Sequence, residues 1–261
     1  MSPTHGAFVW YELMTSDVAA AKSFYADVNG WDLQDMPMPG MTYTIANVGG
    51  TGVAGLMTLP DEVRDAGGRP GWIGYVAVDD VDAAAAAFEQ DGGMIHRAPD
   101  DIPGVGRFAV VADPQGAVLC LFKGSSPEPA PLTPMMKRTP GQAGWHELLA
   151  FDHVALFEFY AKHFGWTKDQ AVDMGGMGIY QLFAHGGEAI GGMMNKPAQV
   201  PAPFWLYYFI TDGIDEASER VKAGDGTVVN GPHEVPGGMW ILQCLDPQGA
   251  LFALVGPRKR S

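Results

Sequence analysis

The chain has 261 residues, 47% of them hydrophobic and 18% charged, a composition that allows a buried core and is unlike that of a disordered segment. Its formal charge of -14 disfavours nucleic acid and anionic membranes as partners. Two cysteines exclude a disulfide framework and a Cys-rich zinc site. The first residues hold no basic segment and no long apolar stretch, so we expect a cytoplasmic protein without a cleaved signal or a membrane-spanning segment.

The first predicted elements are a strand, a helix and short strands. Residues 7–13 alternate in character and are rich in aromatic side chains, which favours a strand. Asp17 then predicts the start of a helix that ends at residues 29–30, an Asn-Gly pair. Short strands with Gly-rich turns are predicted over 42–48 and 52–57.

The next part of the chain repeats this order. Residues 72–78 predict a strand, and Asp79 or Asp80 caps a helix that runs to Glu89. Two more strands flank residues 113–116 (DPQG), a good turn sequence. The order strand–helix–strand–strand–strand is expected four times along the chain, which indicates an α+β fold.

The chain contains a whole-domain duplication. Residues 10–13 (WYEL) recur as 145–148 (WHEL), an offset of 135 (145 − 10), and a Phe-Tyr pair and a Gly-Trp pair recur at the same offset. Residues 113–116 recur as 246–249 at an offset of 133 (246 − 113). Self-similarity of this kind predicts two copies of one domain that differ by small loop insertions.

We predict the two domains over residues 5–124 and 143–257, joined by a linker over 125–142. The linker contains five prolines, namely Pro127, Pro129, Pro131, Pro134 and Pro140. Proline at this density cannot continue a helix or a central strand, so an extended linker is expected.

Four sequence features of the chain resemble one family, and three of them occur in both copies. They are the Asp-capped helix that ends in Phe-Tyr, the Gly-Trp pair, the Val-Asp-Asp-Val-Asp helix start at 78–82 and the Asp-Pro-Gln-Gly turn before the last strand. This pattern resembles the vicinal oxygen chelate superfamily of glyoxalase I, bleomycin-resistance and fosfomycin-resistance proteins and extradiol dioxygenases. The resemblance covers nearly the whole chain outside the linker. It implies two βαβββ units per domain around a cavity, where a divalent metal binds two vicinal substrate oxygens.

The ligand positions of such a metal hold other residue types here. Transferred one by one, they hold Trp10, Ile73 and Cys120 in the first copy and Trp145, Leu206 and Ala253 in the second. Only Glu188 stands at the edge of the remaining ligand strand. Indole and alkyl side chains cannot coordinate a divalent cation, and one cysteine does not make a site. We therefore predict no metal and no other cofactor.

Glu12 and Glu147 are the candidate catalytic residues. Each lies two residues after Trp10 or Trp145, so a strand places it on the same face as that tryptophan, which the resemblance makes the cavity face. A carboxylate among aromatic side chains can have a raised pKa and act as an acid or base. The alternative is a structural acid that pairs with an arginine or reaches water. The tryptophans either fill the space of the lost metal or stack on a planar ligand.

Tyr75, Tyr208 and Cys120 are candidate ligand contacts. Tyr75 and Tyr208 each follow a lost metal ligand by two residues, so they are expected on the cavity face, where a hydroxyl can bind a carbonyl oxygen or can serve packing alone. Cys120 faces the cavity by position and is either a nucleophile or a small packed side chain. Tyr43 and Tyr180 are further wall residues.

Arg107 and Trp240 hold matching positions in the two copies and predict unequal cavities. Arg107 can keep Glu12 ionised by charge pairing, whereas Trp240 offers Glu147 no such partner. Glu147 is then the better acid or base and Glu12 the better structural acid.

Two motifs that match catalytic or cofactor patterns in letters do not carry that chemistry. His146 and Glu147 begin an HExxH pattern, but the pattern ends in Ala and lies on a predicted strand. Residues 50–55 match GxGxxG, yet no helix is predicted after them, so a dinucleotide site is not expected.

Two functions from different classes follow. One is a metal-independent enzyme of glyoxalase-like ancestry, a lyase or isomerase that acts on a small oxygenated or aromatic metabolite. The other is a non-catalytic protein that sequesters a small molecule, as bleomycin-resistance proteins do. For either function we expect a small-molecule partner and a protein that is a monomer or a homodimer. The sequence leaves open whether the cavities form within each copy or across the copies.

Overall fold

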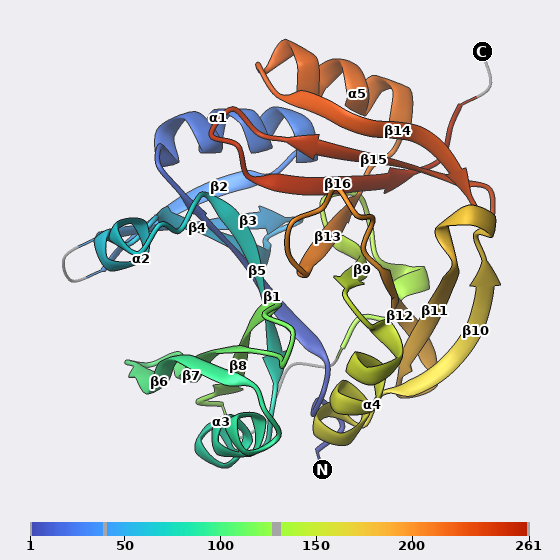
Figure 1. The fold of residues 1–261 in the computed structure, drawn as a ribbon. Coiled ribbons are helices and arrows are strands. Elements are labelled where there is room, and N and C mark those ends of the chain that lie inside the picture. Colours follow the sequence, from blue (N-terminus) through green and yellow to red (C-terminus); the bar gives the residue numbers. More distant parts are fainter. Residues whose placement is uncertain (1, 39–40, 127–131, 260–261) are drawn as a thin grey trace. The chain divides into compact units, whose positions relative to one another are not determined.

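The computed structural model describes residues 2–38, 41–126 and 132–259 (Figure 1). The first copy contains β1 (Phe8–Thr15), α1 (Val18–Asn29), β2 (Asp32–Met38), β3 (Met41–Val48), β4 (Thr51–Thr58), α2 (Asp61–Asp65), β5 (Gly71–Ala77), α3 (Val81–Gln90), β6 (Met94–Ile102), β7 (Gly106–Ala112) and β8 (Val118–Gly124). The short helix η1 (Met135–Lys137) follows. The second copy contains β9 (Ala143–Ala150), α4 (His153–Phe164), β10 (Thr167–Asp173), η2 (Gly175–Met177), β11 (Ile179–His185), β12 (Glu188–Asn195), β13 (Phe204–Ile210), α5 (Ile214–Ala223), β14 (Thr227–Val235), β15 (Met239–Leu245) and β16 (Leu251–Gly256).

The strands form two eight-stranded sheets, which confirms the predicted α+β fold. Their orders are β2-β3-β4-β1-β5-β8-β7-β6 and β10-β11-β12-β9-β13-β16-β15-β14. Within each βαβββ unit the first strand pairs in parallel with the last one, as β1 does with β4 and β13 with β16, and the remaining pairs are antiparallel. Of the predicted linker, residues 127–131 lie outside the described part of the chain.

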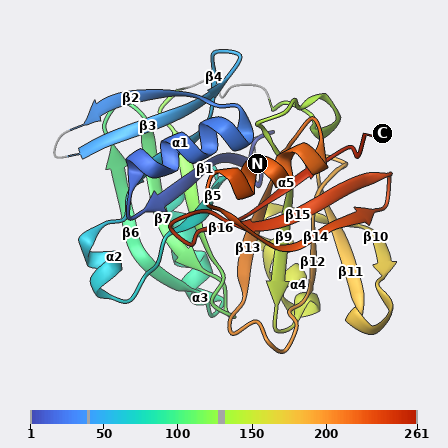
Figure 2. The same cartoon turned by 90° about the horizontal axis from the view of Figure 1, so that it is seen from above.

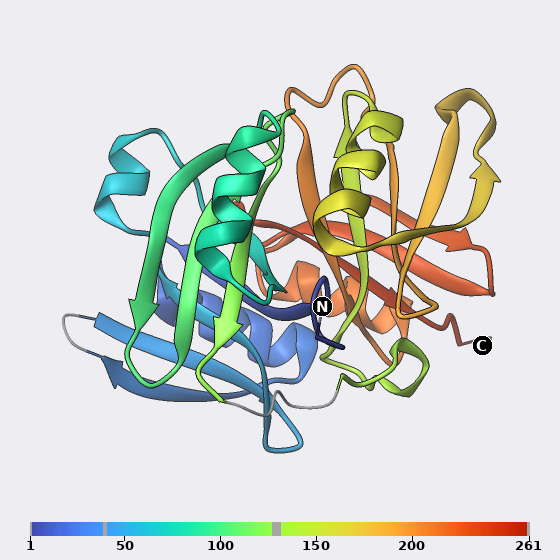
Figure 3. The same cartoon turned by 90° about the horizontal axis from the view of Figure 1, so that it is seen from below.

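The chain divides into two compact units, and each unit draws on both sequence copies. Unit 1 comprises Met1–Val9, Gly74–Met135 and His146–Trp205, and unit 2 comprises Trp10–Ile73, Met136–Trp145 and Leu206–Ser261. Unit 2 contains α1 and α5, which pack against each other (Figure 2). In unit 1, α3 packs on β6, β7 and β8 (Figure 3).

The two long helices of the first βαβββ unit in each copy begin and end as predicted. Asp17 accepts a hydrogen bond from the backbone of residue 20 at the start of α1, and Asp152 caps α4 in the same way. Each helix ends at a glycine in the left-handed region, Gly30 at φ 69° and Gly165 at φ 70°. A glycine pays no Cβ penalty in this conformation, so the Gly-Trp pair ends the helix.

A buried hydrogen-bond chain in unit 2 joins a helix of the first copy to a turn of the second. The Trp72 indole N–H donates to the Tyr25 hydroxyl at 2.9 Å, and that hydroxyl donates to Asp246 Oδ2 at 3.1 Å. The other oxygen of Asp246 accepts from the backbone N–H groups of residues 248 and 250 within its Asp-Pro-Gln-Gly turn. One aspartate therefore folds the turn and holds the helix of the other copy.

Unit 1 contains the equivalent chain with the copies exchanged. Trp205 donates to the Tyr160 hydroxyl at 3.2 Å, and Tyr160 donates to Asp113 Oδ2 at 2.8 Å. Burial raises the pKa of both Asp113 and Asp246, and the hydrogen bonds from the tyrosines and from the backbone act in the opposite direction. Each unit thus depends on a buried carboxyl group from one copy and a tyrosine from the other.

A second pair of hydrogen bonds repeats this exchange. The Trp31 indole donates to the carbonyl of Gly141 at 2.7 Å, and the Trp166 indole donates to that of Gly6, also at 2.7 Å. Both glycines have positive φ values, and a Cβ at Gly6 would overlap the backbone of Phe164. The Gly-Trp tryptophan of each copy is therefore anchored on the segment that precedes the first strand of the other copy.

Three elements of the first copy had no predicted residue range, namely β2, α2 and β6, and the side chains of β6 are mostly exposed. Residues 32–38 form β2, whose side chains are mostly exposed and so lack the buried face that marks a strand. The five-residue helix α2 has no side-chain cap. None of the described helices is long and apolar enough to cross a membrane.

We expect Tyr25→Phe and Tyr160→Phe each to lower the free energy of unfolding by about 1–3 kcal/mol, because a buried carboxyl group loses a hydrogen-bond donor. Urea denaturation followed by circular dichroism measures the change. Lys22→Ala removes an exposed ion pair with Asp35 and is the control, with an expected loss of about 1 kcal/mol or less. Losses no greater than that of the control would show that the buried chains do not hold the units.

The raised pKa values of Asp113 and Asp246 predict a dependence of stability on pH. The folded state binds these protons more tightly than the unfolded state, so their contribution is present below the unfolded pKa of about 3.9 and is lost as the pH rises through the folded values. The unfolding free energy of the wild type minus that of the Asp113→Asn/Asp246→Asn variant should therefore fall as the pH rises through this window. Urea titrations at a series of pH values measure the difference, and an increase would contradict the assignment.

Candidate functional site

Glu12 lies in a hydrogen-bonded cluster in unit 2 that β1 and β3 form together. The Trp10 indole N–H donates to the Tyr43 hydroxyl at 2.9 Å, and that hydroxyl donates to Glu12 Oε2 at 3.0 Å. Glu12 is buried, with 9% of its surface exposed, and Tyr43 is half-buried. Trp10 and Glu12 therefore share one face of β1, as strand alternation predicts. We call Trp10, Tyr43 and Glu12 the carboxylate cluster.

Two glycines of β4 give the carboxylate cluster its space. Gly55 is the register partner of Glu12, and a Cβ at Gly55 would overlap the hydroxyl group of Tyr43. A Cβ at Gly52 would meet the Trp10 ring at 3.4 Å. Both rings therefore lie over strand backbone that has no side chain in the way. The GxGxxG letters at residues 50–55 have this packing role, in a hairpin and strand with no helix behind them.

Unit 1 repeats part of this arrangement in the second copy. Glu147 of β9 is paired in register with Gly192 of β12, and a Cβ at Gly192 would overlap the ring of Tyr180. Glu147 is 8% exposed. The pairs Tyr43–Tyr180 and Gly55–Gly192 share an offset of 137 (180 − 43, 192 − 55), so the tyrosine-over-glycine contact belongs to both copies. Gly52, in contrast, corresponds to Ala189 at that offset.

His146 replaces Tyr11 in the second copy and lies in the core. Its ring stacks on Phe8 at 4.0 Å, its Nδ1 is hydrogen-bonded to the Ile190 carbonyl, and 1% of its surface is exposed. The HExxH letters lie on strand β9, so His146 has no place in a zinc-protease site. Trp145, the neighbouring residue, is half-buried.

Tyr75 and Cys120 lie in one row of unit 1. They are register partners in the parallel pair β5–β8, and Cys120 faces Val110 of β7 on its other side. Tyr75 is 5% exposed and Cys120 1%, and the Tyr75 ring contacts Phe108 and Phe122. The predicted common face for Tyr75 and Cys120 agrees with this register, whereas a contact of either residue with a ligand stays a prediction.

Tyr208 of β13 lies at the corresponding place in unit 2, where its neighbours across the sheet are Ala253 of β16 and Gln243 of β15. The side chains of Tyr208 and Gln243 are polar. Tyr208 and Gln243 both pair in register with Ala253 of β16, one from each side. Gln243 Nε2 donates to the Tyr208 hydroxyl at 2.9 Å across this alanine. Ala253 stands where the family resemblance expects a metal ligand, and its small side chain allows the contact. Tyr208 is 2% exposed.

The expected role of Arg107 as the charge partner of Glu12 is wrong. Its guanidinium donates to Asp82 of α3 at 2.7 and 2.8 Å and to Asp101 at 3.0 Å. β7 and β8 pair without a bulge, so Arg107 shares the helix-facing side of β7 with Ala109, whereas Val110 points to the side of Tyr75. The error is one of strand parity: Arg107 faces α3, where it binds Asp82, and it also binds Asp101 of β6.

Trp240 needs the same correction. β15 pairs with β16 without a bulge, so Trp240 lies on the face of Leu242 and opposite that of Gln243. The guanidinium carbon of Arg258 lies 4.5 Å from the centre of its ring, and Arg258 also binds Asp215 of α5. Trp240 therefore packs on the helix side and does not share the face of Tyr208, so the predicted inequality of Glu12 and Glu147 loses its structural basis.

The metal positions of the family do not fit a metal in this chain. Trp10, Ile73, Trp145, Leu206 and Ala253 offer no donor atom for a divalent cation. Among residues 2–38, 41–126 and 132–259, no three His, Cys, Asp or Glu side chains lie in a group that can hold an ion. Metal independence stays a prediction, and no catalytic step here is assigned to a metal.

Sequence reasoning ranked Tyr43 too low and missed the glycines beneath it. The signal that finds them is a tyrosine on one strand opposite a glycine on the next, at the same place in both copies. Gln243 also escaped notice, because its counterpart in the first copy is Val110, at an offset of 133 (243 − 110).

We expect Gly55→Ala to displace the Tyr43 hydroxyl from Glu12 and to lower the free energy of unfolding by about 1–3 kcal/mol, as overpacking does. The Trp10 indole N–H resonance in a ¹H–¹⁵N spectrum should shift at the same time. Gly71→Ala is the matched control, because the nearest atom to a Cβ at Gly71 is the carbonyl oxygen of Arg69, 3.9 Å away. An unchanged Trp10 resonance in Gly55→Ala would contradict the geometry of the carboxylate cluster.

Known proteins resemble the chain in sequence and in fold. "Putative glyoxylase CFP32" of Mycobacterium bovis is 31% identical over 250 residues, 95% of this chain and 94% of that protein. "Anthracycline biosynthesis protein DnrV" of Streptomyces peucetius is 31% identical over 267 residues, 97% of this chain and 94% of that protein. In fold, the Mn(II)-bound glyoxalase from Novosphingobium aromaticivorans matches with a TM-score of 0.61 at 18% identity, over 98% of this chain and 83% of that one.

A homoprotocatechuate 2,3-dioxygenase variant from B. fuscum also has this fold, with a TM-score of 0.63 at 17% identity over 97% of this chain and 71% of that one. The family model of the Glyoxalase/Bleomycin resistance protein/Dioxygenase superfamily matches residues 7–121 and 143–254, one segment in each copy. These matches agree with the duplicated βαβββ pattern. The chain therefore belongs to the Glyoxalase/Bleomycin resistance protein/Dioxygenase superfamily.

Proposed function

We propose that the protein binds a small, planar, oxygenated metabolite against the carboxylate cluster and moves a proton on it in a lyase-type or isomerase-type reaction. The observation that carries this proposal is the hydrogen-bond chain from Trp10 through Tyr43 to Glu12. A buried carboxylate beside a phenol is a common way to place an acid and a base together.

The direction of the two hydrogen bonds sets the chemistry. Tyr43 donates its proton toward Glu12 while its oxygen accepts from the Trp10 indole. The indole N–H and the Glu12 carboxylate together fix the position of the Tyr43 hydroxyl. Glu12 accepts a proton from an acidic C–H or O–H group of the ligand, and the electron pair of the broken bond moves to, or stays on, a ligand oxygen. Once Glu12 is protonated, the single O–H of Tyr43 turns from Glu12 and donates to that oxygen.

The class of ligand follows from the rings and from the charge. Trp10 presents an indole next to the Tyr43 ring, and aromatic faces favour flat ligands. The formal charge of -14 disfavours an anion, so we propose a neutral or cationic compound. A relative named as an anthracycline biosynthesis protein supports a fused, oxygenated ring system, and a relative named as a glyoxylase supports a small carbonyl compound.

Sequestration without reaction is the second candidate, and the loss of metal donor atoms at the family's positions favours it. A binding protein needs the rings and the hydrogen bonds of the carboxylate cluster but no proton transfer. In either case we propose a cytoplasmic protein that acts as a monomer or homodimer on a small molecule. The experiment below separates the two functions.

We expect 1,4-dihydroxyanthraquinone, a flat neutral probe, to quench the tryptophan fluorescence of the wild type, with a quenching that saturates as the probe concentration rises. Tyr43→Phe should weaken binding about fivefold to tenfold, the value of one hydrogen bond. If the protein is an enzyme for such compounds, mass spectrometry shows a product that Glu12→Gln abolishes while binding persists.

The matched variants for this experiment are Glu147→Gln and Tyr180→Phe in the second copy, and elemental analysis of the same preparation tests for a bound metal. Binding with no product in any variant supports sequestration. Binding that neither Tyr43→Phe nor Glu12→Gln changes would refute the assignment to the carboxylate cluster.

A further inference from the structure

A row of four polar side chains crosses the second half of the second copy and shares no residue with the carboxylate cluster. His233 Nε2 lies 2.8 Å from Asn230 Oδ1, Asn230 Nδ2 donates to Gln243 Oε1 at 3.1 Å, and Gln243 Nε2 donates to the Tyr208 hydroxyl at 2.9 Å. The row begins at exposed residues, His233 and Asn230, and ends at Tyr208 in the core. We call these residues the amide row.

The strand geometry of β14 brings the outer part of the amide row together. The register between β14 and β15 shifts between Val228 and Asn230 and again between Asn230 and His233. Such irregularities re-aim side chains and are frequent next to functional sites. Asn230 is paired in register with Gln243. Because the register shifts between Asn230 and His233, these two side chains lie on the same side of β14 although they are three residues apart.

The hydrogen bonds leave His233 with a defined tautomer. Asn230 uses its amide N–H toward Gln243, so its carbonyl oxygen faces His233 and can only accept. With the amide in this orientation, the neutral imidazole donates from Nε2 to Asn230, and Nδ1 holds the lone pair. A histidine that is oriented by a side-chain oxygen on one nitrogen and has a lone pair on the other is the arrangement of a general base.

The first copy has the same register shifts in β6 but different chemistry. Arg97 and Asp100, at the places of Asn230 and His233, form an ion pair at 2.8 Å. Val110 stands at the place of Gln243 and cannot hydrogen-bond to Tyr75. The amide row is therefore a feature of the second copy alone at these matching positions, not a requirement of the fold.

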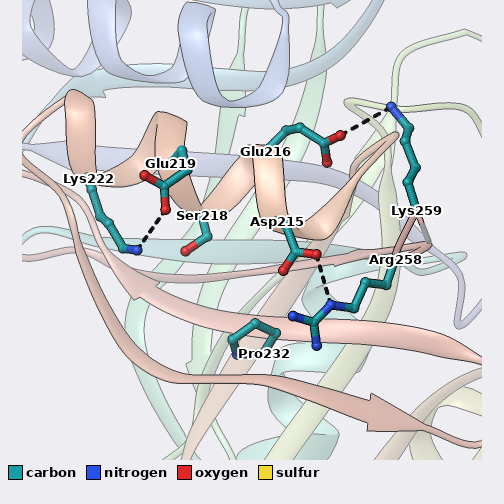
Figure 4. Close-up of a pocket in the computed structure, with 8 residues that line it drawn as sticks. All are labelled: Asp215, Glu216, Ser218, Glu219, Lys222, Pro232, Arg258 and Lys259. Carbon is teal, nitrogen blue, oxygen red and sulfur yellow. Dashed lines mark hydrogen bonds and ion pairs between the residues drawn. The ribbon is translucent and has the colours of Figure 1, made fainter. Parts of the chain in front are cut away.

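Pro232, the residue before His233, borders a hollow whose charged side chains are paired with one another. Glu234 follows His233 on β14, and Ile241 is the register partner of His233 on β15. Beyond Pro232, this hollow of about 590 Å³ is lined by α5 and the end of the chain (Figure 4). Its charges form the pairs Asp215–Arg258, Glu216–Lys259 and Glu219–Lys222.

We propose that His233 is a general base for a neutral ligand with a weakly acidic O–H group, such as a phenol, and that Asn230 and Gln243 are its positioning residues. The O–H bond of the ligand breaks, its electron pair stays on the oxygen, and the proton bonds to Nδ1 of His233. The resulting imidazolium keeps its Nε2–H bond to Asn230 and holds the anion by charge. Because the acidic surface repels a free anion, the neutral ligand binds first and ionises in place.

4-Nitrophenol tests this proposal, because its phenolate is yellow and its ionisation can be followed by absorbance. We expect the wild type to lower the pH of half-ionisation by about one unit, a tenfold change in the equilibrium. His233→Gln should abolish the shift. Gln243→Val, which installs the residue of the first copy, should remove most of it, and ¹⁵N spectra should then show both tautomers of the His233 ring. His153→Gln is the control, an exposed histidine bonded to Asn195 that should leave the shift unchanged.

No shift with the wild type, or a shift that persists in His233→Gln, would overturn the proposal. If a variant does not fold, the ¹⁵N spectrum of the ligand-free wild type decides, since a neutral His233 ring with its proton on Nδ1 is incompatible with the amide row. The probe and the readout differ from those for Glu12, so either proposal can fail while the other stands.

Discussion

The contact between each Asp-Pro-Gln-Gly turn and the tyrosine of the other copy is the constraint on which both compact units depend. Asp113 and Asp246 each use one oxygen to close their own turn and the other to bind Tyr160 or Tyr25. A buried carboxyl group is costly unless its hydrogen bonds are complete, so turn and helix stabilise each other. Duplication of the domain supplies both partners within one chain, and neither copy completes the contact alone.

Local chemistry explains which parts of the fold were predictable. Asp17 and Asp152 cap helices, and Gly30 and Gly165 end them, because these positions depend on residues within a few places in sequence. The exchange of partners between copies was not predictable, because Tyr25 and Tyr160 occupy identical motifs and a linear pattern does not say which aspartate each one meets. The edge strand β2 escaped because exposed side chains leave no hydrophobic period.

For the candidate site, the sequence predicted which residues of one strand share a face, but not which residues of other strands they contact. Alternation placed Trp10 with Glu12, and the hydrogen bonds agree. Arg107 was assigned to the wrong face, since one residue of register reverses the side on which a side chain points. The contacts of Tyr43 and of Gln243 reach across an intervening strand, and both exist because a glycine or an alanine stands there. A contact that passes over a glycine or an alanine leaves little trace in a pattern of residue types.

The glycines of β4 have a consequence for how the two halves of the gene can diverge. The first copy carries Gly52 where the second carries Ala189, so a single methyl group separates the floors beneath Trp10 and beneath the corresponding part of β12. A methyl group at position 52 would contact Ile45 at 3.3 Å and the Trp10 ring at 3.4 Å, while the helices, turns and buried carboxyl groups that hold each unit stay as they are. After duplication, one floor can therefore be remodelled for a new ligand while the other preserves the old one.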